Sequence, residues 1–77
     1  MNTKFRWFWM EGIDQPDLKT LRFLVQSHTG SCLGEIRWYN HWRQYCFYPM
    51  GETVFNSDCL KDINYFVDQL MEERNNK

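Results

Sequence analysis

This chain of 77 residues lacks the closely spaced pairs of cysteine and histidine that are typical of metal-binding and redox motifs. Its three cysteines, Cys32, Cys46 and Cys59, form no Cys-x-x-Cys pair, and an odd number cannot all be joined in disulfides. No secretory leader is visible at the N-terminus, so we expect reduced thiols and a cytoplasmic protein. We also expect no metal site, because structural zinc sites usually have paired ligands and both histidines fall in predicted loops.

Signatures of catalysis are also missing. The chain has no Gly-rich phosphate-binding loop, no motif of a catalytic nucleophile and no metal-binding motif. Cys59 would lie in the first turn of a helix, where the helix dipole can activate a thiol, but its place on the apolar stripe is typical of a buried core residue. We therefore expect a protein that is not an enzyme and needs no cofactor.

The chain has neither a large excess of positive or negative charge nor a long run of apolar residues. A formal net charge of −1 argues against generic binding to nucleic acid or to a membrane surface. No apolar run is long enough to span a bilayer. The charge is uneven, however: between Lys19 and Tyr48 four basic residues accompany Glu35 alone, whereas five acids accompany three bases from Asp58 onward.

Aromatic residues, by contrast, are abundant, at 18 % of the chain. A chain this short has room for one domain, 1–77, and buries a modest fraction of its surface. Each well-buried ring contributes about 2 to 3 kcal/mol of transfer free energy, which partly replaces the missing core volume. The densest aromatic run lies between Gly34 and Pro49 and contains Trp38, Tyr39, Trp42, Tyr45, Phe47 and Tyr48.

Hydrophobic periodicity predicts an α+β fold, a small antiparallel sheet of about four strands with one C-terminal amphipathic helix packed on one face. The expected strands are 4–10, 21–26, 33–39 and 44–48, and the expected helix is 58–74. Alternation in the first strand would place Phe5, Trp7 and Trp9 on one apolar face. This strand should end at Glu11-Gly12, before the turn residues 14–17. Asn56 or Ser57 is a natural N-cap for the helix.

The length of the loop in the hairpin formed by strands 33–39 and 44–48 decides which aromatic residues face the helix. A loop of two or four residues would place Tyr45 and Phe47 on the helix side, whereas a loop of three would place Cys46 and Tyr48 there. We favour the even loop because it buries more apolar surface. The candidate binding residues on the outer face and at the hairpin tip are then Arg37, Tyr39, Trp42, Arg43 and Tyr48.

Three stretches carry a recognisable pattern: Leu-Gly-Glu-Ile-Arg-Trp-Tyr at 33–39, Trp-Arg-Gln-Tyr-Cys-Phe-Tyr-Pro at 42–49 and Cys-Leu-Lys-Asp-Ile at 59–63. They resemble a group of small uncharacterised proteins from phages, prophages and gut bacteria. That group shares a Gly-x-Ile-Lys/Arg-Trp-Tyr strand, a Trp-Arg-x-Tyr-x-Phe-x-Pro strand and a Cys-Leu-x-x-Ile helix. The resemblance covers about residues 33–74, and it implies an origin in a mobile element but no particular activity.

Three functional hypotheses follow. The leading one is a non-catalytic binding module that recognises a host macromolecule, such as a protein of a defence system that it would inhibit, because Trp, Tyr and Arg are enriched in interface hot spots. The second is a binder of nucleotides or single-stranded nucleic acid, which would stack bases on the same rings. The third is a structural homodimer. A plain structural interpretation also stands, in which Tyr39 and Tyr48 stiffen the hairpin and Arg37 pairs with Glu35.

Overall fold

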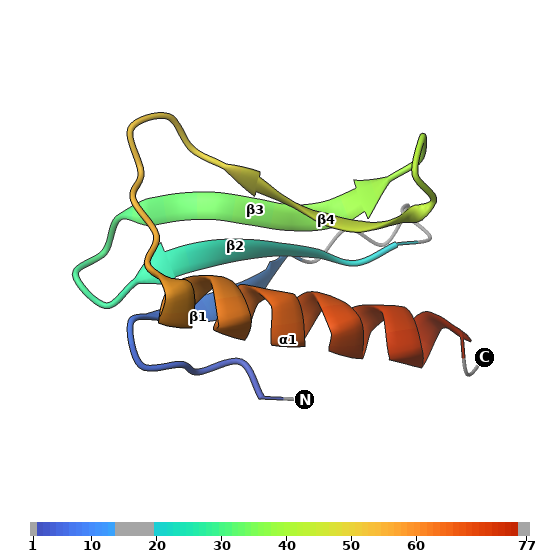
Figure 1. Cartoon of the computed structure of the whole chain (residues 1–77), viewed down its shortest axis with the longest axis horizontal. Helices are drawn as coiled ribbons and strands as arrows, with labels where there is room; N and C mark the ends of the chain where they lie inside the picture. The colour runs from blue at the N-terminus through green and yellow to red at the C-terminus, as the bar shows by residue number, and fades with distance from the viewer. Residues whose placement is uncertain (1, 14–19, 76–77) are drawn as a thin grey trace.

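A computed structural model describes residues 2–13 and 20–75 of the chain. A four-stranded antiparallel sheet, in the order β1-β2-β3-β4, carries helix α1 across one face (Figure 1). The predicted α+β fold is confirmed, and the predicted turn at 14–17 lies outside the described residues. The elements are β1 (Phe8–Ile13), β2 (Arg22–Ser27), β3 (Cys32–Tyr39), β4 (Gln44–Pro49) and α1 (Ser57–Asn75).

The first strand differs from the prediction in its position. It begins at Phe8 rather than Lys4, and it continues through Glu11 and Gly12 to Ile13. All six of its residues pair with β2. This pairing satisfies the backbone of the strand and outweighs the turn preference of Gly12, because tertiary context overrides local propensity in sheets.

The segment before β1 turns back on itself, with the Phe5 N–H donating to the Phe8 carbonyl at 2.9 Å. Phe8 and Met10 therefore face the core and are buried, whereas Trp7 is 46 % exposed. The predicted inward face of the first strand is wrong for Trp7 and Trp9, because a shift of one residue moves every side chain of a strand to the opposite face.

The core lies between the sheet and α1. Phe66 is fully buried at its centre, and its ring meets that of Phe23 edge to face, with 4.8 Å between the ring centroids. Helical spacing predicts an apolar stripe of Cys59, Leu60, Ile63, Phe66, Val67, Leu70 and Met71. All of these pack into or against the core except Leu60, which is 52 % exposed. Within the described residues, no helix has the length and apolar character to cross a membrane. The buried residues are Phe8, Met10, Val25, Ile36, Tyr45, Cys59, Ile63, Phe66 and Leu70.

Helix α1 begins with a side-chain cap. The Cys59 N–H donates to the Asn56 Oδ1 at 2.8 Å, which satisfies one of the backbone donors that a helix start leaves free. Asp58 in the first turn favours the positive end of the helix dipole. Asn56 is therefore the N-cap, one of the two residues that the sequence left open.

The β3–β4 hairpin has the predicted even register. Four residues, 40–43, connect the strands, Trp38 pairs with Tyr45, and Ile36 pairs with Phe47. Tyr45 is buried, and its hydroxyl accepts a hydrogen bond from the Leu21 N–H at 3.2 Å. These contacts fix which side chains of the hairpin remain on the face away from α1.

Candidate functional site

Four of the five predicted binding residues form one continuous surface on the side of the hairpin away from α1. We call Arg37, Tyr39, Trp42 and Tyr48 the aromatic platform. The alternation along β3 and β4 places three of them on the outer face, and the hairpin loop adds Trp42. The sequence pattern therefore identified a set of side chains that do meet in space.

The side chains of the platform contact one another in series. The Arg37 guanidinium lies over the Tyr48 ring, 4.1 Å from its centroid. The Tyr48 and Tyr39 rings meet edge to face at 6.2 Å, and the Tyr39 and Trp42 rings do so at 4.9 Å. Edge-to-face pairs at such distances attract each other beyond simple area burial. Each ring therefore limits the rotamers of the next.

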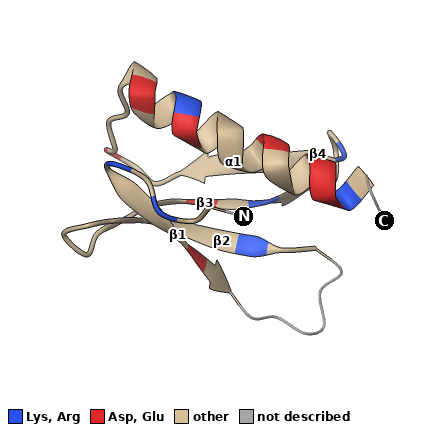
Figure 2. Cartoon of the chain, turned by 90° about the horizontal axis from the view of Figure 1, so that it is seen from below, with Lys and Arg blue, Asp and Glu red and all other residues tan. Residues whose placement is uncertain are grey.

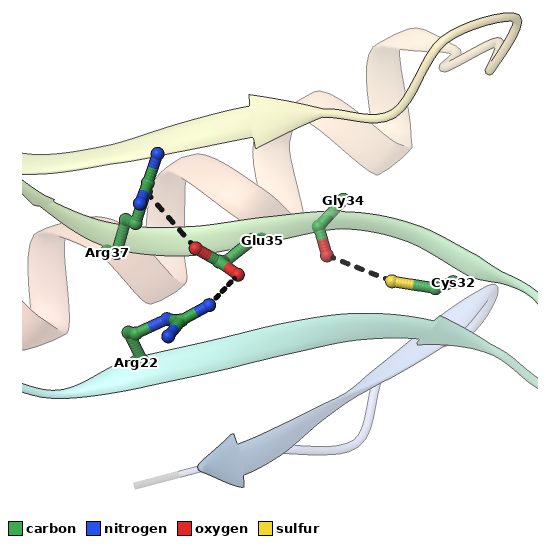
Figure 3. A network of polar contacts seen from close by, with 5 residues as sticks. All are labelled: Arg22, Cys32, Gly34, Glu35 and Arg37. Atoms are coloured by element: carbon green, nitrogen blue, oxygen red, sulfur yellow. Dashed lines mark hydrogen bonds and ion pairs between the residues drawn. The ribbon is translucent and has the colours of Figure 1, made fainter. Parts of the chain in front are cut away.

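Arg37 is also tied to the sheet through Glu35. The Arg37 Nε lies 3.1 Å from one oxygen of this carboxylate, and the Arg22 Nη2 lies 2.5 Å from the other (Figure 3). The hydrogen bond to Glu35 raises the pKa of Arg22. One carboxylate thus holds two guanidinium groups across β2 and β3. The pair of Arg37 and Glu35 is visible in the sequence as an i, i+2 spacing on one strand, whereas nothing in the sequence aligns Arg22 with β3.

Cys46 lies on the same outer face as the platform, opposite Arg37 in the pairing of β3 with β4. A surface hollow of about 280 Å³ is lined by Tyr39, Trp42, Cys46, Phe47 and Tyr48. Burial raises the pKa of the Cys46 thiol, so this cysteine is a poor nucleophile at neutral pH. Cys46 is not one of the predicted binding residues, although strand alternation places it on the outer face with Tyr48.

Trp42 and Arg43 occupy the hairpin loop. Trp42 is 67 % exposed, the highest exposure among the aromatic residues described. Arg43 has a φ of 53°, in the left-handed region, and its N–H donates to the Tyr39 carbonyl at 2.9 Å, which closes the loop. Arg43 is exposed and, within the described part of the chain, makes no ring or ion-pair contact with the platform, so its predicted binding role stays a prediction.

The outer face of the sheet is balanced in charge. Among the outward positions of the described strands, Arg22 and Arg37 are matched by Glu11 and Glu35, and both signs appear on the sheet ribbon (Figure 2). Glu11 accepts a hydrogen bond from the Gln26 amide at 2.9 Å. The acidic residues of α1 do not belong to this face, because the helix covers the opposite face of the sheet (Figure 2). The face therefore offers rings and charges that balance one another, rather than a field that favours phosphate.

Within the described residues, no group of three or more His, Cys, Asp or Glu side chains is arranged to hold a metal ion. Two hollows lie away from the platform. One, of about 280 Å³, is lined by Arg6, Trp7, Asp58, Lys61 and Asp62, and the other, of about 370 Å³, is lined by Lys4, Trp9 and His28.

Comparison with known proteins gives one informative similarity. The chain is 38 % identical over 60 residues to an uncharacterised 9.3 kDa protein of Acholeplasma phage L2, and the match covers 77 % of each chain. No protein-family model matches the chain, and no solved structure matches it. The relation to a small phage protein is thus established, whereas the three-part motif noted in the sequence stays a prediction.

Proposed function

We propose that this chain, which belongs to the family of the 9.3 kDa protein of Acholeplasma phage L2, is a non-enzymatic binding module. Its aromatic platform binds a host protein, for which a component of a host defence system is the leading candidate. The observation that carries this proposal is the continuous series of Arg37, Tyr48, Tyr39 and Trp42 on an outer face of the sheet.

The composition and rigidity of the platform support a protein partner. Trp, Tyr and Arg are the residue types most enriched in interface hot spots. The platform side chains already hold one another, so binding would cost little side-chain entropy, and preorganised groups of this kind raise affinity. Trp42 is the most exposed ring of the platform, which suits it to fill a pocket on the partner.

The electrostatics favour protein over nucleic acid as the partner. A nucleic-acid site needs cations that are free to meet phosphate. Arg37 and Arg22 instead share the carboxylate of Glu35, so neither guanidinium is free to compensate a phosphate without losing that pair. Arg43 in the hairpin loop is then a single exposed arginine, fewer than the several cations that a phosphate backbone recruits. Rings flanked by neutralised charges match the hydrophobic centre and polar rim of a protein interface.

A pull-down from a host-cell lysate tests the proposal. The tagged wild type should retain a partner that the Arg37→Ala/Tyr39→Ala double variant and the Trp42→Ala variant both lose. Trp7→Ala is the matched control, because it removes another exposed tryptophan, at 46 % exposure, from outside the platform. Circular dichroism should show that every variant is folded. Identical partner lists for wild type and the platform variants would contradict the proposal.

Two other uses of the same surface give different results. A nucleotide binder would show quenching of tryptophan fluorescence by nucleotides or short oligonucleotides at low salt, and Trp42→Ala would abolish most of it. A structural homodimer would sediment as a dimer at micromolar concentration and would become monomeric when Trp42 or Tyr39 is truncated. A monomer in which Trp42→Ala changes no nucleotide response leaves protein recognition or stiffening of the hairpin as the use of the platform, and the pull-down decides between these two.

A further inference from the structure

A second site lies at the opposite edge of the sheet from the platform. The hollow lined by Lys4, Trp9 and His28 has a volume of about 370 Å³, larger than the hollow on the platform. This volume is within the lower part of the range for small-molecule sites, roughly 300 to 1,000 Å³. Trp9 is on β1 and the platform is on β3 and β4, so strand β2 separates the two sites.

Hydrogen bonds hold the three walls of this hollow together, although they come from distant parts of the sequence. Lys4 pairs with Trp9 as an isolated β-bridge, where the N-terminal segment folds back along β1. His28, in the loop between β2 and β3, lies with its Nε2 3.0 Å from the Phe5 carbonyl. A carbonyl can only accept, so Nε2 carries the hydrogen and Nδ1 is left as an acceptor.

The chemistry of the walls identifies a ligand class. Trp9 offers a large ring for stacking, and the walls are mainly apolar. Lys4 supplies an ammonium group that has no carboxylate partner among residues 2–13 and 20–75. A planar ring that carries an anionic group would match both features at once. The His28 Nδ1 can accept a hydrogen bond from an exocyclic amine on such a ring.

We infer that this hollow is a binding site for a free nucleoside monophosphate, with the base stacked on Trp9 and the phosphate paired with Lys4. This site is independent of the proposed protein-binding function, because it shares no residue with the platform. The lysine here is free for phosphate, in contrast to Arg37, which is already paired with Glu35.

Titration of the full-length, ¹⁵N-labelled protein with adenosine monophosphate tests the inference by nuclear magnetic resonance. The amide signals of Lys4 and His28 and the indole signal of Trp9 should shift, while the Trp42 indole signal should not. Adenosine and inorganic phosphate, each of which carries half of the ligand, should bind at least about tenfold more weakly at low salt.

Two variants separate a ligand contact from a structural role. Lys4→Gln should weaken the monophosphate by about threefold to tenfold and leave adenosine unchanged, because only the phosphate meets the ammonium group. Trp9→Leu should weaken both ligands by about tenfold or more. Trp7→Leu is the matched control, because Trp7 is an exposed tryptophan of the same N-terminal segment that does not line this hollow, and it should leave both affinities unchanged.

Three results would overturn the inference. One is the absence of shifts at Lys4, Trp9 and His28 at millimolar monophosphate, and another is an equal loss of adenosine and monophosphate binding in Lys4→Gln. The third is tighter binding of a trinucleotide than of the monophosphate, which would show that the hollow takes a strand. None of these outcomes bears on whether the platform binds a protein, so the two proposals fail separately.

Discussion

Gly34 is the position where a single methyl group should disturb the hairpin that carries the platform. A Cβ atom built on Gly34 would lie 2.5 Å from the Phe47 Cε1 and 2.7 Å from the Tyr48 carbonyl oxygen. The Phe47 ring can tilt, but the carbonyl belongs to the backbone of β4, which pairs with β3. Gly34→Ala therefore forces the two strands apart at the level of Tyr48.

The expected loss of stability follows from the cost of overpacking. Inserting one methyl group into a well-packed site typically costs about 1 to 3 kcal/mol, and the backbone contact places Gly34→Ala in the upper half of that range. In a domain of this size, each kcal/mol lowers the melting temperature by roughly 4 to 8 °C. We thus expect the melting temperature, followed by circular dichroism, to decrease by about 8 to 24 °C.

Gly51→Ala is the matched control. Nothing lies within 4 Å of its Cβ position, and Gly51 does not have a positive φ. This substitution should be neutral or should stabilise the fold by about 0.4 to 1 kcal/mol, because alanine restricts the unfolded chain. If urea denaturation placed Gly34→Ala within about 0.5 kcal/mol of the wild type, the argument from close strand approach would be refuted.

Three further substitutions or measurements have expected outcomes. Asn56→Ala removes the cap on the Cys59 N–H and should cost about 0.5 to 2 kcal/mol in urea denaturation, so no measurable change would contradict the assigned cap. Phe66→Ala removes a fully buried ring and should lower the free energy of unfolding by about 3 to 5 kcal/mol, which leaves the domain largely unfolded at 25 °C by circular dichroism. A cooperative transition like that of the wild type would contradict the central position of this ring. The raised pKa of Cys46 predicts slow alkylation by iodoacetamide at neutral pH and a rate that increases as pH rises through that pKa. Tyr48→Ala should react faster, because it removes a ring that lines the same hollow as Cys46. The same shift means that the contribution of Cys46 to stability is complete at neutral pH and decreases as pH rises through the raised pKa; site-resolved mass spectrometry that found Cys46 as reactive as an exposed thiol would contradict its burial.

The register of the central hairpin could be predicted from the sequence because the two possible registers differ in the apolar surface that they bury. Only an even loop buries Tyr45 and Phe47 together, so apolar burial selects the register without knowledge of the loop conformation. The register in turn predicted that Tyr39 and Tyr48 share a face. Helix α1 was predictable for a related reason, because its apolar residues recur at helical spacing over its whole length.

The first strand could not be predicted in the same way. Aromatic residues occupy both odd and even positions between Phe5 and Trp9, so alternation does not decide which face of the strand is buried there. The choice is made by pairing with β2, which is a contact between distant residues. The ion pair between Arg22 and Glu35 was missed for the same reason: it joins neighbouring strands, and no local pattern gives the alignment of β2 with β3.

Substitution of Trp42 can distinguish a role of the platform in binding from a role in the stability of the hairpin. Tyr39 and Tyr48 are half-buried and pack on each other, so truncating either one alters stability and binding together. Trp42 is 67 % exposed at the tip of the hairpin, and its principal contact is the Tyr39 ring. The fold therefore gains little from its large apolar side chain, which would be better buried if stability alone mattered. Loss of a partner in Trp42→Ala without loss of stability would consequently assign this ring to recognition, whereas loss of both would assign the whole platform to the stability of the hairpin.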